Sequence, residues 1–207
     1  TGPAGHYQTQ SFCVCMTMLF GGGAAGKRDQ ERKLTRLMNS TNRPPQSNFD
    51  ASSLRDALSC FPTGVVVAAT CGNQGLPVGL TINSFNSVSL EPPLILWSIA
   101  LTAPSLSAFR THPSFSINIL SSDQQDLCMQ FARSSDNKFS DVDWRPGYGG
   151  APVIKDALAV LECRTYRRYE GGDHEIYVGE VMQIDSSDRK PLVFHRGRFV
   201  DLAESAA

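Results

Sequence analysis

The 207-residue chain contains 41% hydrophobic and 19% charged residues and has a net charge of −1, which is typical of a globular protein with one sizeable core. This balance gives no excess of Lys and Arg for binding nucleic acid or an anionic membrane, and no apolar run reaches the about 18 residues that span a bilayer. A small neutral ligand, or one anion held locally, is compatible with these totals.

Six cysteines are spread along the chain, and none of them has the C-x-x-C spacing of a zinc or redox motif. We expect free thiols, no metal site and a reducing compartment, so the cytoplasm is the predicted location. The apolar stretch 12–20 could be the core of a signal peptide, but no basic segment precedes it. The cysteines are Cys13, Cys15, Cys60, Cys71, Cys128 and Cys163.

Residues 1–49 differ in composition from the rest of the chain. They combine a glycine-rich run, a charged run and a polar, proline-containing run, and no period defines an element beyond a short exposed helix at 29–38. We expect this segment to be an N-terminal extension, either flexible or added upstream of a natural start at Met38. The folded domain is then expected to cover residues 50–207.

From Asp50 onward, hydrophobic periodicity predicts many short strands and a few short helices. In chain order, we expect a helix at 50–61, strands at 64–70, 78–88 and 94–100, a helix at 103–113, a strand at 114–120, a helix at 121–133, strands at 157–170 and 174–185, and a hairpin at 191–202. Helices and strands do not alternate regularly, which argues against a doubly wound parallel sheet. A closed antiparallel β-barrel with helices at its ends fits best.

Turn and cap residues mark several boundaries of these elements. Turn residues at 71–77 predict a hairpin between the first two strands, and those at 171–173 predict another near the end of the chain. Residues 134–152 are an irregular excursion rich in Gly, Ser and Asp. The candidate helix N-caps are Ser52 or Ser53, and Ser122 or Asp123.

The segment TINSFNSVSLEPP (81–93) is unusually rich in Ser, Thr and Asn for a strand. In an extended segment some of these polar groups must point inward, where each needs a partner. A flat ligand with many acceptors would supply partners, and backbone N–H groups with hydroxyls can hold a phosphate. Pro92-Pro93 is expected to peel the chain away from its neighbour, since proline donates no ladder hydrogen bond. The alternative is an edge strand whose hydroxyls face water.

A second polar feature is the turn in GGDHEIYVGEV (171–181). An imidazole at this turn, oriented by the adjacent Asp173, could lie at the rim of a pocket. A metal site would need further ligands that the sequence does not show, and an exposed turn histidine is the alternative. In FPTGVVVAAT (61–70), Thr63 lies either at a pocket mouth or in a plain helix-to-strand connection.

Together, these segments resemble the flavin reductase family, the small NAD(P)H:flavin oxidoreductase components of two-component flavin-dependent monooxygenases. The resemblance covers about residues 50–202 and rests on FPTGVVVAAT (61–70), GLTINSFNSVSLEPPLILWSI (79–99), FSINILSSDQQDLCMQFA (115–132), NKF (137–139), GAPVIKDALAVLEC (150–163), YEGGDHEIYVGEV (169–181) and PLVFHRGRF (191–199). It implies an FMN-binding split β-barrel of Greek-key type. It also implies a homodimer with flavin near its interface, and reduction of FMN, FAD or riboflavin by NADH or NADPH for a partner monooxygenase.

The resemblance also implies roles for individual residues in holding the flavin. The ring and ribityl chain would contact Thr63, Thr81, Ile82, Asn83 and Ser84, with donors to ring or phosphate at Ser87, Val88 and Ser89, and a phosphate end formed by Ser98, Ser105, Phe131 and Lys138. Ile82 stands where many relatives have Ala, and Asn86 stands where they have a hydroxyl residue. His174 corresponds to the catalytic turn histidine that reaches the nicotinamide and the flavin edge.

Two other functions stay open at this point. A flavoprotein with tightly bound FMN could reduce another acceptor, such as a corrinoid or a ferric complex. A flavin-binding protein without efficient turnover could act as a carrier. The choices between FMN and FAD, and between NADH and NADPH, are also open, although no Arg cluster is obviously placed for a 2′-phosphate.

Overall fold

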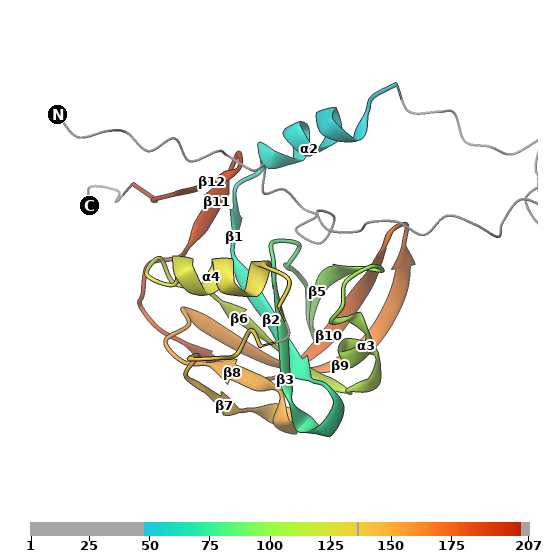
Figure 1. Ribbon diagram of the computed structural model, residues 1–207, viewed down its shortest axis with the longest axis vertical. Helices are drawn as coiled ribbons and strands as arrows, with labels where there is room; N and C mark the ends of the chain where they lie inside the picture. The colour runs from blue at the N-terminus through green and yellow to red at the C-terminus, as the bar shows by residue number, and fades with distance from the viewer. Residues whose placement is uncertain (1–47, 136, 204–207) are drawn as a thin grey trace, which may run out of the picture.

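The computed structural model describes residues 48–135 and 137–203, and these form a mainly antiparallel β fold (Figure 1). The helix expected at 29–38 lies outside the described residues. The helices are α2 (Ala51–Ser59), α3 (Leu106–Thr111) and α4 (Gln125–Ala132), with 3-10 turns η1 (Asn73–Gly75) and η2 (Tyr148–Gly150). No helix in the described part of the chain is both long and apolar enough to span a bilayer.

Twelve strands are present among the described residues. They are β1 (Thr63–Gly64), β2 (Val66–Cys71), β3 (Pro77–Ile82), β4 (Asn86–Leu90), β5 (Pro93–Ala100), β6 (Ser114–Ile119), β7 (Trp144–Pro146), β8 (Pro152–Ile154), β9 (Ala159–Gly171), β10 (His174–Ser186), β11 (Val193–His195) and β12 (Arg198–Val200). Seven of them form one sheet in the order β3-β2-β6-β9-β10-β5-β4. Because β3 and β4 are the two edges of this ladder, the barrel has the split form that the resemblance implies.

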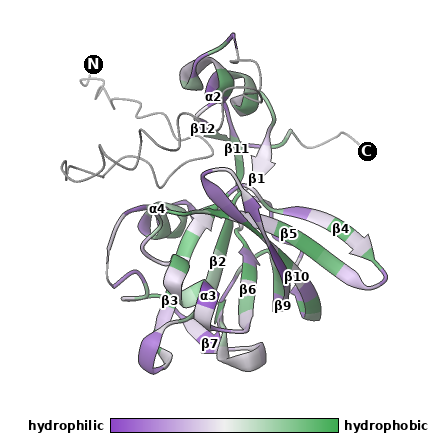
Figure 2. Ribbon diagram, turned by 90° about the vertical axis from the view of Figure 1, so that its right-hand side faces the viewer, coloured by the Kyte–Doolittle hydropathy of each residue, from purple (hydrophilic) through white to green (hydrophobic). Residues whose placement is uncertain are grey.

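The inner face of the sheet encloses an aromatic core. The ring centroids of Trp97 and Tyr177, which face each other across β5 and β10, are 4.9 Å apart and stacked. Phe109 from α3 and Phe115 from β6 pack edge-on against Trp97. Figure 2 shows hydrophobic residues along β2, β5 and β6. Burial of these residues stabilises the barrel and fixes which side chains point outward.

Most elements are close to the predicted ranges, but the helix caps differ. The N-cap of α2 is Asp50, whose Oδ1 accepts a hydrogen bond from Ser53 N at 2.7 Å. The prediction of Ser52 or Ser53 was therefore wrong, because the Asp50 carboxylate caps the N–H of Ser53 and both serines lie inside the first turn of the helix. Helix α4 begins after Gln124, and Asp123 is hydrogen bonded to Ser121 instead of capping the helix.

The predicted strand 78–88 is two strands separated by residues 83–85. β3 and β4 lie at opposite edges of the seven-stranded sheet, so residues 83–85 carry the chain from one edge to the other. The predicted peeling at Pro92-Pro93 was also wrong, since Pro93 opens β5 directly opposite Leu90 of β4. The excursion at 134–152 contains β7, which pairs with β8 in a small separate hairpin.

Candidate functional site

Two predicted site residues lie on the outer face where β5 and β10 pair. Ser98 lies opposite Ile176, and His174 lies opposite Ala100. Residues that alternate with them, Trp97 and Ile99, are buried in the core, so Ser98 and His174 share the other face. Diagonal neighbours in an antiparallel pair lie about 7–8 Å apart, with their Cβ atoms somewhat closer. The fold thus brings together two residues that are 76 positions apart in the sequence.

Ser84 joins this pair from the crossing segment. Its Oγ accepts a hydrogen bond from Ser98 N at 3.0 Å and donates to Ser98 O at 3.2 Å. One side chain therefore takes the place of a neighbouring strand at this point of β5, which explains why a serine is needed where the chain leaves the sheet. Asn83, beside it, is half-buried.

The turn between β9 and β10 fixes the orientation of His174. Its Nδ1 lies 2.7 Å from Asp173 Oδ1, so the ring N–H donates to the carboxylate. This hydrogen bond lowers the pKa of Asp173 below its ordinary value. Asp173 O accepts a hydrogen bond from Leu101 N at 2.9 Å, which ties the turn to the end of β5. Gly172 has φ of 71°, a conformation that glycine adopts without strain.

Two further predicted residues offer hydroxyl groups without a local structural use. Thr63 Oγ1 on β1 is buried and has no hydrogen-bond partner among the described residues. Ser105 precedes α3, a helix of six residues, and its side chain makes no capping hydrogen bond. A buried hydroxyl without a partner is uncommon and is consistent with a partner that binds from outside the chain.

Strand β4 places three predicted residues along the exposed edge of the sheet. Ser87 lies opposite Ile95 and Ser89 lies opposite Leu94, so Val88 is an extra residue in a bulge. Ser89 Oγ accepts a hydrogen bond from Glu91 N at 3.2 Å. This edge adjoins Ser98 on β5, and ligand contacts for the three residues stay a prediction.

The remaining predicted residues have structural partners within the barrel. Thr81 Oγ1 donates to Cys128 O at 2.7 Å, and Ile82 belongs to the barrel core. The Phe131 ring is fully buried against Phe139, with centroids 4.8 Å apart. Lys138 Nζ donates to Phe131 O at 2.9 Å, and burial lowers the pKa of this lysine. A place for these four residues beside a flavin stays a prediction, and Phe131 has no exposed surface for it in this structure.

Sequence reasoning missed a charged cluster directly beneath His174. Glu175 points to the opposite face of β10 and is held by Arg110 of α3 and Arg168 of β9. Strand alternation was an available signal. If His174 faces outward, Glu175 must face the core side, where a carboxylate needs a cation. The partner could not be identified, since Arg110 is 65 residues away in the sequence.

The chemistry of this face is that of neutral donors around one imidazole. Its hydroxyl and backbone groups can bind carbonyl and ring nitrogen atoms, which fits a flavin. On β1, outside this sheet, the buried Thr63 hydroxyl without a partner among the described residues also fits a bound group. No group of three or more His, Cys, Asp or Glu side chains in the described residues is arranged to hold a metal ion.

Comparisons with known proteins identify what this arrangement is similar to. Residues 58–203 match the family model described as flavin reductase like domain. The chain is 43% identical to FMN reductase (NADH) SmoA of Agrobacterium fabrum over 72% of this chain and 85% of the relative. It is 40% identical to the reductase component of a flavin-dependent trigonelline monooxygenase of Acinetobacter baylyi, over 74% of this chain but only 49% of that relative.

A solved structure extends the likeness to three dimensions. The NADH:FAD oxidoreductase SgcE6 of Streptomyces globisporus, in complex with NAD and FAD fragments, superposes with a TM-score of 0.73 at 40% identity. The match covers 76% of this chain and 96% of that one.

Proposed function

The chain belongs to the family of flavin reductase like domains, and on this premise we propose that it catalyses the reduction of FMN or FAD by NADH. We further propose that the reduced flavin is supplied to a separate monooxygenase component. The activities for which SmoA, SgcE6 and the trigonelline monooxygenase reductase are named support both statements. The chain spans about half the length of the trigonelline monooxygenase reductase. The activity of that whole protein is therefore only a proposal for this chain.

One observation carries the proposal: Ser98 and His174 share the outer face of β5 and β10, where hydrogen bonds hold the Ser98 backbone and the His174 imidazole in place. Ser84 braces Ser98 from the crossing segment, and Asp173 braces His174 from the turn. Groups held in this way lose little entropy when a ligand binds, which is how a reductase aligns two cofactors.

When bound, the flavin supplies the hydride-accepting chemistry, and the nicotinamide supplies the hydride. We propose that Ser84, Ser98, Asn83, Thr63 and the β4 edge bind and orient the flavin by neutral hydrogen bonds. His174 would orient the nicotinamide at the rim, with Asp173 holding its Nδ1 as a proton donor to the carboxylate. No nucleophile or acid pair is required of the protein, because positioning supplies most of the rate.

The test is the steady-state oxidation of NADH, followed by its near-ultraviolet absorbance, with and without added FMN, FAD or riboflavin. We expect oxidation that depends on added flavin and saturates in it, and the three saturation curves rank the flavins. The same assay with NADPH measures the nicotinamide preference. Folded protein that binds flavin but oxidises neither nicotinamide would contradict the proposed function.

We also propose that the active form is a homodimer. Helix α2, with β11 and β12, projects from one end of the barrel (Figure 1), and α2 has no buried residue. Phe61 is 72% exposed and Leu90 on the β4 edge is 96% exposed, a pattern that favours an apolar interface. Sedimentation velocity is expected to give twice the chain mass at assay concentrations, and a monomer that is fully active would contradict this.

The remaining assignments concern domain limits and location. We propose that residues 50–207 form the catalytic domain, that residues 1–49 lie outside it, and that the enzyme works in the cytoplasm. Four cysteines of the described residues are free thiols, which supports a reducing compartment. Full activity and unchanged thermal stability after removal of residues 1–49 would support the domain limits, and loss of folding would contradict them.

A further inference from the structure

A carboxylate between two arginines lies directly behind the candidate site. The Glu175 side chain is only 12% exposed. Its Oε2 accepts hydrogen bonds from Arg110 Nε at 2.9 Å and Arg110 Nη2 at 2.7 Å. Arg168 Nη1 lies 3.7 Å from Oε1 and also donates to Arg110 O at 3.4 Å. The three side chains therefore connect β10, α3 and β9.

The position of this cluster in the fold relates it to His174. Glu175 follows His174 on β10 and lies opposite Ile99, so its side chain points inward while the imidazole points outward. Arg110 belongs to α3, which begins just after the chain leaves β5 at Ala100. The hydrogen bond from Leu101 N to Asp173 O joins the same two segments at a second point.

In this cluster two guanidinium groups face one carboxylate. Burial acts to raise the pKa of Glu175, but the hydrogen bonds that the carboxylate accepts and the positive charges of Arg110 and Arg168 together outweigh burial, so this pKa lies below its ordinary value. Burial raises the pKa of the neighbouring Tyr177 hydroxyl to about 12, so Tyr177 stays neutral. The carboxylate is thus the anion at this point, and a largely buried carboxylate without its cation would be costly.

We propose that Glu175 is a positioning residue for the reductase reaction. Through its contact with Arg110 it holds the Asp173–His174 turn against the segment that follows β5, and so fixes the position of the imidazole on the outer face. The inference rests on the proposed function. Glu175 touches neither flavin nor nicotinamide in this account, since it lies on the other face of β10. Its effect is transmitted through the turn, which is why loss of the pair should act on nicotinamide binding more than on flavin binding.

The same hairpin offers a matched control. Arg164 Nη2 donates to Glu180 Oε2 at 2.5 Å, so this pair joins β9 and β10 with the same residue types. Glu180 lies opposite Leu94, near the far end of β5 from His174. A general effect of removing an ion pair from this hairpin should appear equally in Glu180→Gln.

The experiment compares Glu175→Gln and Glu180→Gln with the wild-type chain. Amide hydrogen exchange at Leu101 is measured by NMR without flavin or nicotinamide, relative to amides of the central strand β6. In Glu175→Gln we expect exchange at Leu101 and the KM for NADH each to rise about 10-fold, while the FMN dissociation constant and kcat change less than about 2-fold. Glu180→Gln is expected to change none of these by more than about 2-fold.

Two further variants test whether the pair acts as a unit. Arg110→Ala combined with Glu175→Gln is expected to give the same KM as Glu175→Gln alone, because the interaction is already lost. Arg110→Lys keeps the positive charge but loses the contact through two nitrogen atoms. Its KM for NADH is therefore expected to lie between those of the wild type and Glu175→Gln. Independent, additive effects of the two substitutions would contradict a shared role.

The outcomes separate this inference from the proposed function. Activity of the wild-type chain decides the proposed function, whereas exchange at Leu101 needs no cofactor and tests the contact itself. Unchanged exchange in Glu175→Gln would overturn the inference whether or not the wild type reduces flavin. Faster exchange with an unchanged KM would show a purely structural ion pair and would also overturn it.

Discussion

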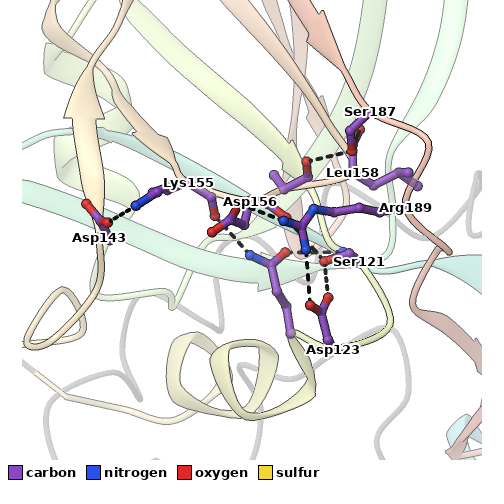
Figure 3. A network of polar contacts seen from close by, with 10 residues as sticks. Ser121, Asp123, Asp143, Lys155, Asp156, Leu158, Ser187 and Arg189 are labelled. Carbon is purple, nitrogen blue, oxygen red and sulfur yellow. Dashed lines mark hydrogen bonds and ion pairs between the residues drawn. The ribbon is translucent and has the colours of Figure 1, made fainter.

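The two ends of the β9–β10 hairpin are both held by ion pairs between arginine and acidic side chains, but they differ in what surrounds these ion pairs. At the far end, Arg189 donates to Asp123 Oδ2 at 3.1 Å and to Asp156 Oδ1 at 2.7 Å (Figure 3). These contacts join the loop after β10, the segment before α4 and the turn before β9. At the near end, the cluster of Glu175 lies behind Ser98 and His174.

The comparison shows that similar ion pairs have different surroundings in one hairpin. At the far end, the polar groups bind one another: Ser121 Oγ donates to Asp123 Oδ1 at 2.5 Å, and Ser187 Oγ donates to Leu158 O at 3.1 Å (Figure 3). At the near end, the ion pair is inside and the outer face presents an imidazole and hydroxyls. A ligand site therefore needs polar groups that the fold has fixed but not fully used.

The largest expected effect is at the near end. His174→Ala should lower kcat/KM for NADH by roughly 100-fold, because a group that orients the nicotinamide is lost, and should leave the FMN dissociation constant within about 2-fold. Steady-state kinetics and flavin fluorescence measure the two quantities. His195→Ala, on β11, is the matched control and should have normal kinetics. A collapse of flavin binding with unchanged turnover per bound flavin would contradict the role of His174.

A substitution in the middle of the hairpin, between its two ends, should lower the stability of the whole barrel. A Cβ at Gly179 would overlap the Phe115 ring and lie 3.3 Å from Cys163 Cβ. Gly179→Ala should therefore reduce the free energy of unfolding by about 2 kcal/mol, as expected for an overpacked core. Denaturant unfolding gives the value, and Gly64→Ala, whose Cβ would have no neighbour within 4 Å, is the control. Equal stability of the two variants would show that the core is looser than described.

At the far end, removal of the central guanidinium should cost stability but not activity. Arg189→Ala breaks two partly exposed ion pairs, and we expect a loss of about 1 kcal/mol in the free energy of unfolding with kcat and KM unchanged. Denaturant unfolding and the NADH assay measure both. An increase in KM as large as that of Glu175→Gln would mean that the two ends are coupled, and the contrast between them would fail.

The smallest effect is expected for an exposed pair at the far end. Lys155 Nζ lies 2.8 Å from Asp143 Oδ2, and both side chains are more than half exposed. Solvent screens such a pair, so Lys155→Ala should leave the melting temperature and the kinetics unchanged. A clear drop in melting temperature, measured by calorimetry, would show that exposed ion pairs at this end are more important than their geometry suggests.

Local patterns were sufficient to predict the hairpin but not its connections. The alternation in β9 and β10 and the glycines at the turn predicted both strands and the place of His174, because these signals come from adjacent residues. The break of the chain at Asn83 depends on Ser84 binding Ser98 across 14 positions, which no local period contains. Arg110 and Glu175 are separated by 65 positions in the sequence, so local patterns carry even less information about their contact.

The burial of individual site residues was equally hard to predict. Phe131 has the spacing of a helix face, but whether that face meets a ligand or the core depends on how α4 packs on the barrel. Asp50 caps α2 in place of the nearby serines because its side chain reaches Ser53 N. These outcomes follow from tertiary contacts, whereas the order of strands and helices along the chain follows from hydrophobic pattern and turn chemistry.

The most direct test of the central claim is an anaerobic single-turnover experiment with flavin bound to the protein. NADH is mixed with the wild-type chain and with His174→Ala, and the loss of the visible flavin absorbance is followed in time. We predict full bleaching in both, with the wild type faster by roughly 100-fold when NADH exceeds the bound flavin but stays below its KM. Bound flavin that keeps its absorbance after excess NADH or NADPH would contradict the account.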